Sequence, residues 1–278
     1  MDLIASLQCA DQPGIVHAMT SAVLAAEGNI IENQQFTDHA TNTFVMRTRF
    51  ESAQSLENAA ATLQAGLAQF NPALHIRPTH QRPRALVLVT KESHCLRDLL
   101  YLLELNEMPV EIPLVISNRE ELKELVEAHG IPFMYLPIDS NNKAGQEAVM
   151  LKKIEELKID FVVLARYMQI LSAEFCAELP GKIINIHHSF LPSFKGAKPY
   201  YQAHDRGVKL IGATAHFVTS DLDEGPIIEQ DVQRVTHSLS PEELTAIGRD
   251  VECVVLARAV KYFIERRILL NGTRTVIF

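Results

Sequence analysis

Four short apolar segments, separated by stretches of helical periodicity, constrain the fold of this chain more than any other feature. They cover residues 85–90, 110–117, 161–165 and 182–187, and they are rich in Val, Ile and Leu. Continuous apolar segments of this length are typical of parallel strands that are buried on both faces. The pattern predicts an α/β fold with a doubly wound, mostly parallel, Rossmann-like sheet. Two further strands and one long helix over residues 241–270 are expected to follow.

A polar stretch with several prolines, residues 71–84, separates this region from a different N-terminal pattern. Upstream of it the expected order is strand, helix, two strands, helix and a short last strand. Such a βαββαβ order packs as an antiparallel sheet with both helices on one face. At roughly 150 residues per domain, the length of the chain allows two domains. We therefore predict one domain over residues 1–82 and a second over residues 83–278.

Composition excludes several classes of protein. The chain has 34 acidic and 26 basic residues, so no overall field attracts nucleic acid or an anionic membrane. Its four cysteines lie far apart and form no metal-binding or disulfide motif. No apolar run approaches the roughly 18 to 20 residues of a membrane span, and the N-terminus lacks the basic start of a signal peptide. We expect a cytoplasmic protein with reduced thiols and with no nucleic-acid or membrane partner.

Polar side chains stand at the ends of two strands that are otherwise apolar. Side chains alternate between the faces of a strand, so Asn185 and His187 should share one face and His188 should point to the other. His216 ends a later strand, and Asp223 lies in the turn after it, within reach of an imidazole on a neighbouring strand. An amide, an imidazole and a carboxylate suit attack of water or an amine on a carbonyl carbon. The amide and a protonated imidazole would stabilise the oxyanion.

Two other interpretations of these residues are open at this point. Asn and Asp in turns commonly make only local hydrogen bonds, and a strand His is commonly a satisfied polar side chain. The chain also has 11 histidines, which could bind a metal. However, His187 and His188 are expected to diverge, and no expected helix has the H-x-x-x-H spacing of a metal site. We therefore expect no metal and no redox cofactor.

Two motifs carry a family resemblance. NIHHSFLPSFKGAKPY, followed by HFVTSDLDEGPIIEQ, resembles the signature of the folate-dependent formyl transferase and hydrolase superfamily. The resemblance implies that Asn185, His187 and Asp223 are catalytic, with Asp223 pairing with His187 and acting as base for water or as proton shuttle. LARYMQIL resembles the loop whose backbone binds the folate pterin, and Lys195 would face the folate tail, the formate exit or solvent. The implied substrate-binding residues are Met168, Gln169, Ile170, Leu171, His216, Val218 and Leu222.

Other segments distinguish the branches of this superfamily. Members that transfer the formyl group to a ribonucleotide have a glycine-rich phosphate loop, and members that act on tRNA have a basic C-terminal barrel. This chain has TKESHCLRD, without glycine, after residue 89, and it ends in TRTVIF. DQPGIV, near the N-terminus, resembles the opening of an ACT domain, which is a βαββαβ regulatory module. The combination resembles the hydrolytic branch of the superfamily.

The resemblance implies hydrolysis of 10-formyltetrahydrofolate to formate and tetrahydrofolate. The reaction would supply formate for purine biosynthesis and balance the one-carbon pool, with the folate as substrate and no cofactor. Two alternatives are kept. One is transfer of the formyl group to an amine acceptor, and the other is an amino-acid sensor without catalytic activity.

The ACT-like segment implies an effector site at a helix N-terminus, where backbone N–H groups bind a carboxylate. The implied residues are Asp11, Pro13, Gly14 and Ile15, and the expected effector is glycine or methionine. A βαββαβ sheet also has an unpaired edge strand, which favours a homo-oligomer built on dimers. The alternative is an ACT fold that serves assembly only.

Overall fold

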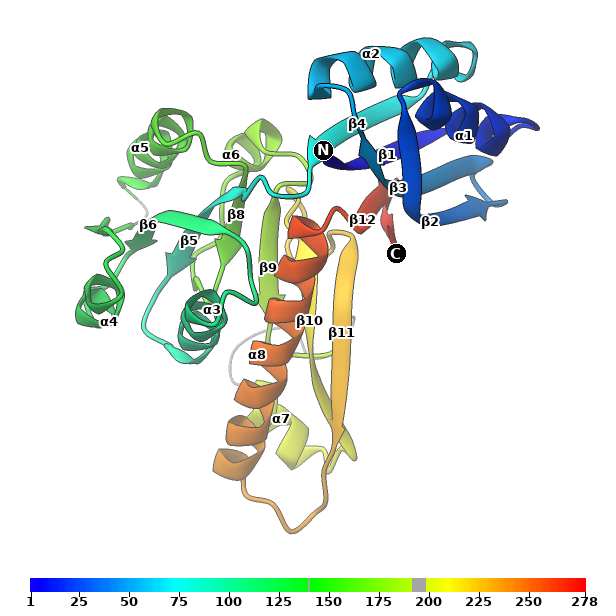
Figure 1. Cartoon of the computed structure of the whole chain (residues 1–278). Coiled ribbons are helices and arrows are strands. Elements are labelled where there is room, and N and C mark those ends of the chain that lie inside the picture. Colours follow the sequence, from blue (N-terminus) through cyan, green and yellow to red (C-terminus); the bar gives the residue numbers. More distant parts are fainter. Residues whose placement is uncertain (140, 192–198) are drawn as a thin grey trace. The chain divides into compact units, whose positions relative to one another are not determined.

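The computed structural model describes residues 1–139, 141–191 and 199–278, which divide into two compact units (Figure 1). The first unit contains Met1–Arg82 and Glu265–Phe278, and the second contains Pro83–Ile264. The break after residue 82 lies where we predicted a domain boundary. The last residues differ from the prediction, because Glu265–Phe278 pack with the N-terminal unit instead of continuing the second domain.

The first unit has the predicted βαββαβ order. Its four-stranded sheet is antiparallel and has the order β2-β3-β1-β4, and α1 and α2 pack against each other (Figure 1). Alternate residues of β1, including Leu3 and Leu7, are fully buried against helical residues such as Met19 and Leu63. The elements are β1 (Asp2–Ala10), α1 (Ile15–Ala25), β2 (Gly28–Asp38), β3 (Thr43–Ser52), α2 (Leu56–Leu67), η1 (Ala68–Phe70) and β4 (Ala73–Pro78).

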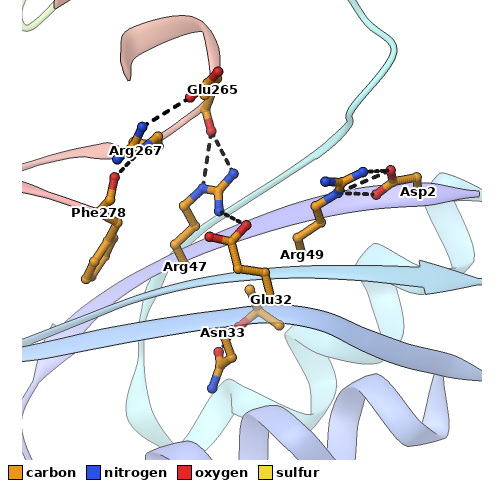
Figure 2. Close-up of polar contacts among 9 residues, drawn as sticks. Asp2, Glu32, Asn33, Arg47, Arg49, Glu265, Arg267 and Phe278 are labelled. Carbon is orange, nitrogen blue, oxygen red and sulfur yellow. Dashed lines mark hydrogen bonds and ion pairs between the residues drawn. The ribbon is translucent and has the colours of Figure 1, made fainter. Parts of the chain in front are cut away.

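The C-terminal segment of this unit is a β-hairpin, and its first residues, 268–270, lie where the end of the long helix was predicted. The strands β12 (Ile268–Asn271) and β13 (Arg274–Ile277) flank Gly272, whose φ of 62° suits a tight turn. Arg47 of β3 is buried and donates Nε and Nη2 to the carbonyl oxygen of Glu265 at 3.2 and 3.1 Å (Figure 2). Asn271 donates to Asp38 Oδ2 at 2.8 Å. These contacts explain why the last residues belong to the first unit.

The second unit contains the predicted doubly wound sheet. Its described strands have the order β11-β10-β9-β8-β5-β6-β7, of which β7, β6, β5, β8 and β9 are parallel and β10 and β11 are antiparallel to their neighbours. The short β7 was not predicted. The strands are β5 (Arg84–Val89), β6 (Glu111–Ser117), β7 (Phe133–Tyr135), β8 (Phe161–Leu164), β9 (Ile183–His187), β10 (Leu210–Phe217) and β11 (Ile227–Arg234).

The helices of the second unit surround this sheet. The last of them, α8, packs against β10 and β11 and ends at Ile264, six residues before the predicted end at residue 270 (Figure 1). None of the described helices combines the length and the apolar character that a membrane span requires. The helices are α3 (His94–Glu104), α4 (Lys123–Ala128), α5 (Lys143–Glu156), α6 (Ala173–Glu178), α7 (Pro199–Asp205) and α8 (Pro241–Ile264).

The strand order creates a switch point between β5 and β8. From β5 the chain builds outward through β6 and β7, and it then returns to the other side of β5 to add β8 and β9. Loops after neighbouring strands diverge at such a point, and a crevice opens at the carboxyl ends of the strands. The segments after β5 and β8 are therefore the places where a ligand site is expected.

Candidate active site

The loop after β8 is fixed to the loop after β5. Met168 donates its backbone N–H to Thr90 Oγ1 at 3.0 Å, and the backbone N–H of Ala165 donates to Leu88 at 3.0 Å. Between them Arg166 has a φ of 63°, which a non-glycine residue adopts at a cost of about 1 to 3 kcal/mol. Tertiary contacts of the Arg166 side chain, such as its ion pair with Glu252, hold this conformation.

The pairing of β9 with β10 brings Asn185 opposite His216. His216 Nδ1 lies 2.8 Å from the carbonyl oxygen of Phe217, so Nδ1 carries the proton and donates it. Nε2 of the same ring is then an acceptor, and it lies 3.2 Å from Nδ2 of Asn185. Burial lowers the pKa of His216, which keeps the ring neutral in this role. One N–H of the Asn185 amide is thus bound, and the other is available to a ligand.

The same pair of strands places His187 next to Asp223. His187 Nδ1 lies 3.2 Å from Asp223 Oδ1, and this hydrogen bond lowers the pKa of the Asp223 carboxyl group. Within the described residues the other ring nitrogen, Nε2, is buried and has no hydrogen-bond partner. The carboxylate therefore orients the imidazole and leaves Nε2 to meet a reacting group.

The turn that carries Asp223 depends on a close backbone approach. Asp223 has a φ of 58°, and two residues later a Cβ at Gly225 would lie 1.7 Å from the carbonyl oxygen of Phe217. Only glycine permits this approach. The turn thus returns the chain to β10 and holds the carboxylate beside the imidazole.

We expect Gly225→Ala to destabilise the second unit by about 1 to 3 kcal/mol and to abolish the activity of this site, because the added methyl group must displace the turn. Gly145→Ala is the matched control. A Cβ at Gly145, in α5, meets no atom within 4 Å, so we expect unchanged activity and about 0.5 to 1 kcal/mol of added stability. Chemical unfolding and an activity assay check both variants. Parental activity of Gly225→Ala would contradict the proposed role of the turn.

A cavity of about 240 Å³ joins these elements. The loop after β8, the end of β9 and the loop after β10 line it, together with Arg166, Tyr167 and His188. All residues that the sequence predicted for catalysis and for substrate binding reach this cavity. They are Asn185, His187, Asp223, Met168, Gln169, Ile170, Leu171, His216, Val218 and Leu222.

The expectation that His188 points away from His187 was wrong. The two rings are tilted by 32° with centroids 5.1 Å apart, and both side chains line the cavity. The physical reason is that β9 ends at His187, so the alternation of a strand does not extend to the next residue. Burial, with help from the charge of Arg166, lowers the pKa of His188 from 6.5 to about 4.

This shift predicts a pH dependence of stability. A depressed histidine pKa means that the unfolded chain binds more protons than the folded chain between pH 4 and 6.5, so stability is lost as the pH falls through this range. Relative to His188→Gln, we expect the second unit to lose about 3 kcal/mol of unfolding free energy from pH 7.5 to pH 4. Urea unfolding of both proteins measures the difference. A difference that does not change with pH would contradict the burial of a neutral His188.

The implied effector residues lie in the first unit. Gly14, with a φ of 97°, precedes α1, and Asp11 donates its backbone N–H to Asn42 at 2.9 Å. Pro13 is exposed, whereas the Ile15 side chain is 2% exposed and belongs to the core. Ile15 could therefore offer a ligand only its backbone. Lys195 lies outside the described residues.

A buried ionic cluster beside the cavity was not predicted. Glu252 of α8 is 1% exposed, and its carboxylate accepts a hydrogen bond from Tyr200 Oη at 2.6 Å and lies 2.7 Å from His94 Nε2. Arg166 Nε lies 3.4 Å from the same carboxylate. Burial raises the pKa of Glu252, but these partners outweigh it and lower the pKa. The sequence does hold a clue, because Glu252 occupies an apolar-periodic position of α8, between the buried Gly248 and Val255.

The chain is similar to known proteins over its whole length. Residues 83–260 match the Formyl transferase family. The chain is 44% identical over 277 residues to a formyltetrahydrofolate deformylase of Corynebacterium sp. (strain P-1), covering 99% of this chain and 97% of that protein. Crystal structures of formyltetrahydrofolate deformylases are similar to the whole chain. The one from Burkholderia mallei has a TM-score of 0.96 and 47% identity, with 100% of this chain and 99% of that chain covered. The one from Pseudomonas putida has a TM-score of 0.96 and 42% identity, with both chains fully covered.

Proposed function

This chain belongs to the formyltetrahydrofolate deformylase family, and we propose that Asn185, His187 and Asp223 carry out the family's reaction in the cavity of the second unit. The reaction is hydrolysis of 10-formyltetrahydrofolate to formate and tetrahydrofolate. The observation that carries the assignment of these residues is the His187–Asp223 pair, whose residues line the cavity, with Nε2 of His187 buried and unpartnered among the described residues.

The geometry supports a part for each side chain in the reaction. The formyl oxygen becomes an oxyanion when water attacks, and Nε2 of a protonated His187 and the second N–H of the Asn185 amide are the donors that would hold it. Asp223, on the other side of the imidazole, keeps the ring oriented and stabilises its charge. The carboxylate then accepts the proton of the attacking water and passes it to N10. Because N10 carries an aryl group, it is a weak base and a tolerable leaving group once protonated.

The folate would lie along two loops of the cavity. Met168 to Leu171 follow β8, and Val218 to Asp223 follow β10, so the pterin can hydrogen-bond to backbone groups of both segments. Met168, Ile170 and Leu222 are half or more exposed, although they are apolar. Exposed apolar side chains at a cavity rim favour a flat aromatic ligand.

The test is incubation of the pure protein with 10-formyltetrahydrofolate and no amine. We expect formate and tetrahydrofolate in equal amounts. A strict need for an added amine would favour the transferase alternative, and inertness under every condition would favour the sensor. One observation favours the sensor alternative, namely that the chain has a separate βαββαβ unit.

We further propose that this first unit is an ACT domain that binds glycine or methionine and joins subunits into dimers. The support is the sheet order β2-β3-β1-β4, in which β2 is an edge strand without a second partner among the described strands, together with the glycine turn before α1. The full chain is required for the test, because the C-terminal hairpin packs with this unit. An amino acid that changes activity supports regulation. A dimer without any amino-acid response supports assembly only.

The physiological role is also a proposal. Formate release in the cytoplasm would supply purine biosynthesis and balance the one-carbon pool. The four cysteines are free thiols, which is compatible with a reducing compartment. Growth of a strain that lacks this protein, with and without added formate and purine, tests the role. Unchanged growth in the absence of both would contradict it.

A further inference from the structure

Arg166 lines the cavity beside His188, yet no step of the proposed hydrolysis uses it. Its backbone has a φ of 63°, and its side chain is held from behind by Glu252, which is 1% exposed. Left-handed residues that are fixed by buried partners cluster at binding sites, because the surrounding structure must hold them in place. The position of Arg166 is therefore set by a cluster built from α3, α7 and α8.

The guanidinium group has unused donors. Within the described residues, Nε and Nη1 of Arg166 are buried and have no hydrogen-bond partner, and the same is true of Nε2 of His187. The approach of Arg166 Nε to Glu252 at 3.4 Å is an ion pair without hydrogen-bond geometry. Nε faces Glu252, so the unpaired donor left for a ligand is Nη1. A buried N–H group of a cation is costly to leave unpaired, so Nη1 favours a ligand with an acceptor oxygen.

The cluster behind Arg166 is better described as an anchor than as a metal site. His94, Cys95 and Glu252 offer ligand atoms within 4.8 Å of one another. However, the Glu252 carboxylate already binds Tyr200 and His94 and faces the charge of Arg166. The ring of Tyr200 also packs on Gly248, where a Cβ would lie 2.1 Å from it. The charge of Glu252 is thus balanced by the protein, and its role is to hold Arg166.

The rest of the cavity indicates which ligand Arg166 would bind. The folate is assigned to the loops after β8 and β10, which leaves Arg166 and His188 next to the catalytic His187. A planar guanidinium group matches the two oxygens of a carboxylate. The reaction itself makes such an anion. The water oxygen bonds to the formyl carbon, the C–N10 bond breaks, N10 takes a proton, and the one-carbon acid leaves as formate with release of one proton.

We propose that Arg166, held by Glu252, forms with His188 a subsite that binds formate as it is produced. The inference rests on the proposed hydrolysis. Because Glu252 offsets most of the charge of Arg166, the subsite binds formate weakly enough to release it. His188 is neutral at neutral pH and adds a hydrogen bond without adding charge.

The test is direct binding of ¹³C-labelled formate to the folate-free full-length protein, followed by NMR. Glu252→Gln keeps an oxygen acceptor for Tyr200 and removes the offsetting charge, so we expect formate to bind about 3- to 10-fold more tightly than to the parent. Arg166→Met combined with Glu252→Gln differs from that variant at one residue and leaves no buried charge unpaired. We expect this double variant to bind formate at least 10-fold more weakly than Glu252→Gln does. Arg249→Met, which removes a half-exposed arginine that pairs with Glu92, should bind formate like the parent.

Equal formate affinity of Glu252→Gln and of the double variant would overturn the proposal, as would a parent that does not bind formate. If the double variant does not fold, Arg166→Lys with Glu252→Gln replaces it, since lysine keeps the charge and removes the fork. An affinity equal to that of Glu252→Gln would then overturn the subsite. Parental hydrolysis without formate binding refutes the subsite alone, whereas absence of formate release from 10-formyltetrahydrofolate refutes the proposed function.

Discussion

Asp223→Asn is expected to lower formate release by about 10²- to 10⁴-fold while the fold and folate binding are retained. The reason for retention is local. Asp223 has a φ of 58°, and asparagine tolerates this left-handed conformation as well as aspartate does, so the turn before Gly225 is not strained by the change. The variant loses the negative charge that orients and stabilises the His187 imidazole. It also loses the group that accepts the proton of the attacking water.

The control for Asp223→Asn is a second His–Asp pair. His204 Nδ1 lies 3.6 Å from Asp205 Oδ1, but the Asp205 side chain is 81% exposed. Asp205→Asn should therefore keep parental activity. Formate release under saturating folate measures the rate, and equilibrium dialysis with tetrahydrofolate measures binding. An active Asp223→Asn variant would exclude Asp223 as the proton acceptor, and loss of folate binding would show that the carboxylate holds the substrate instead.

Asn185→Ala is expected to lower the turnover number by about 10²- to 10³-fold with little change in KM, because an oxyanion donor acts in the transition state. A purely structural Asn185 would contribute the single hydrogen bond to His216, and its loss costs about 1 kcal/mol of stability. A rate loss of this size corresponds to about 3 to 4 kcal/mol of barrier, so the two roles separate by magnitude.

Asn118→Ala is the matched control for Asn185→Ala, because Asn118 is a buried asparagine of the second unit that is not among the residues lining the cavity. We expect it to change stability and not turnover. Steady-state kinetics and urea unfolding of both variants give the comparison. A parental turnover number for Asn185→Ala, together with a modest loss of stability, would show that the amide is structural.

The sequence predicted the architecture because the determining features are local and periodic. The buried strands from β5 to β9 have continuous apolar sequences, and Asn185 and His187 at the end of β9 both line the cavity. The reach of Asp223 to an imidazole followed from the order of strand and turn, and the observed distance of 3.2 Å agrees with it. Short strands such as β7 carry too few residues for a pattern.

Features that depend on tertiary contact could not be predicted in this way. The direction of His188 is set by where β9 ends, and an alternation rule does not report that end. The fixation of the C-terminal hairpin depends on Arg47, which is far away in the sequence, although the two-residue loop Gly272–Thr273 has the glycine-first pattern of a hairpin turn. The pairing of Arg166 with Glu252 likewise joins a strand end to a distant helix. Such pairs have no sequence spacing that identifies them.

The most direct test of the central claim is the source of the new oxygen in the product. When the pure protein acts on 10-formyltetrahydrofolate in H₂¹⁸O without any amine, hydrolysis at this site predicts formate that carries one ¹⁸O atom per molecule, in an amount equal to the tetrahydrofolate formed. Mass spectrometry of formate from the parent and from Asp223→Asn makes the measurement, with labelled formate expected from the parent and almost none from the variant. Unlabelled formate, or labelled formate at equal rates from both proteins, would contradict the account.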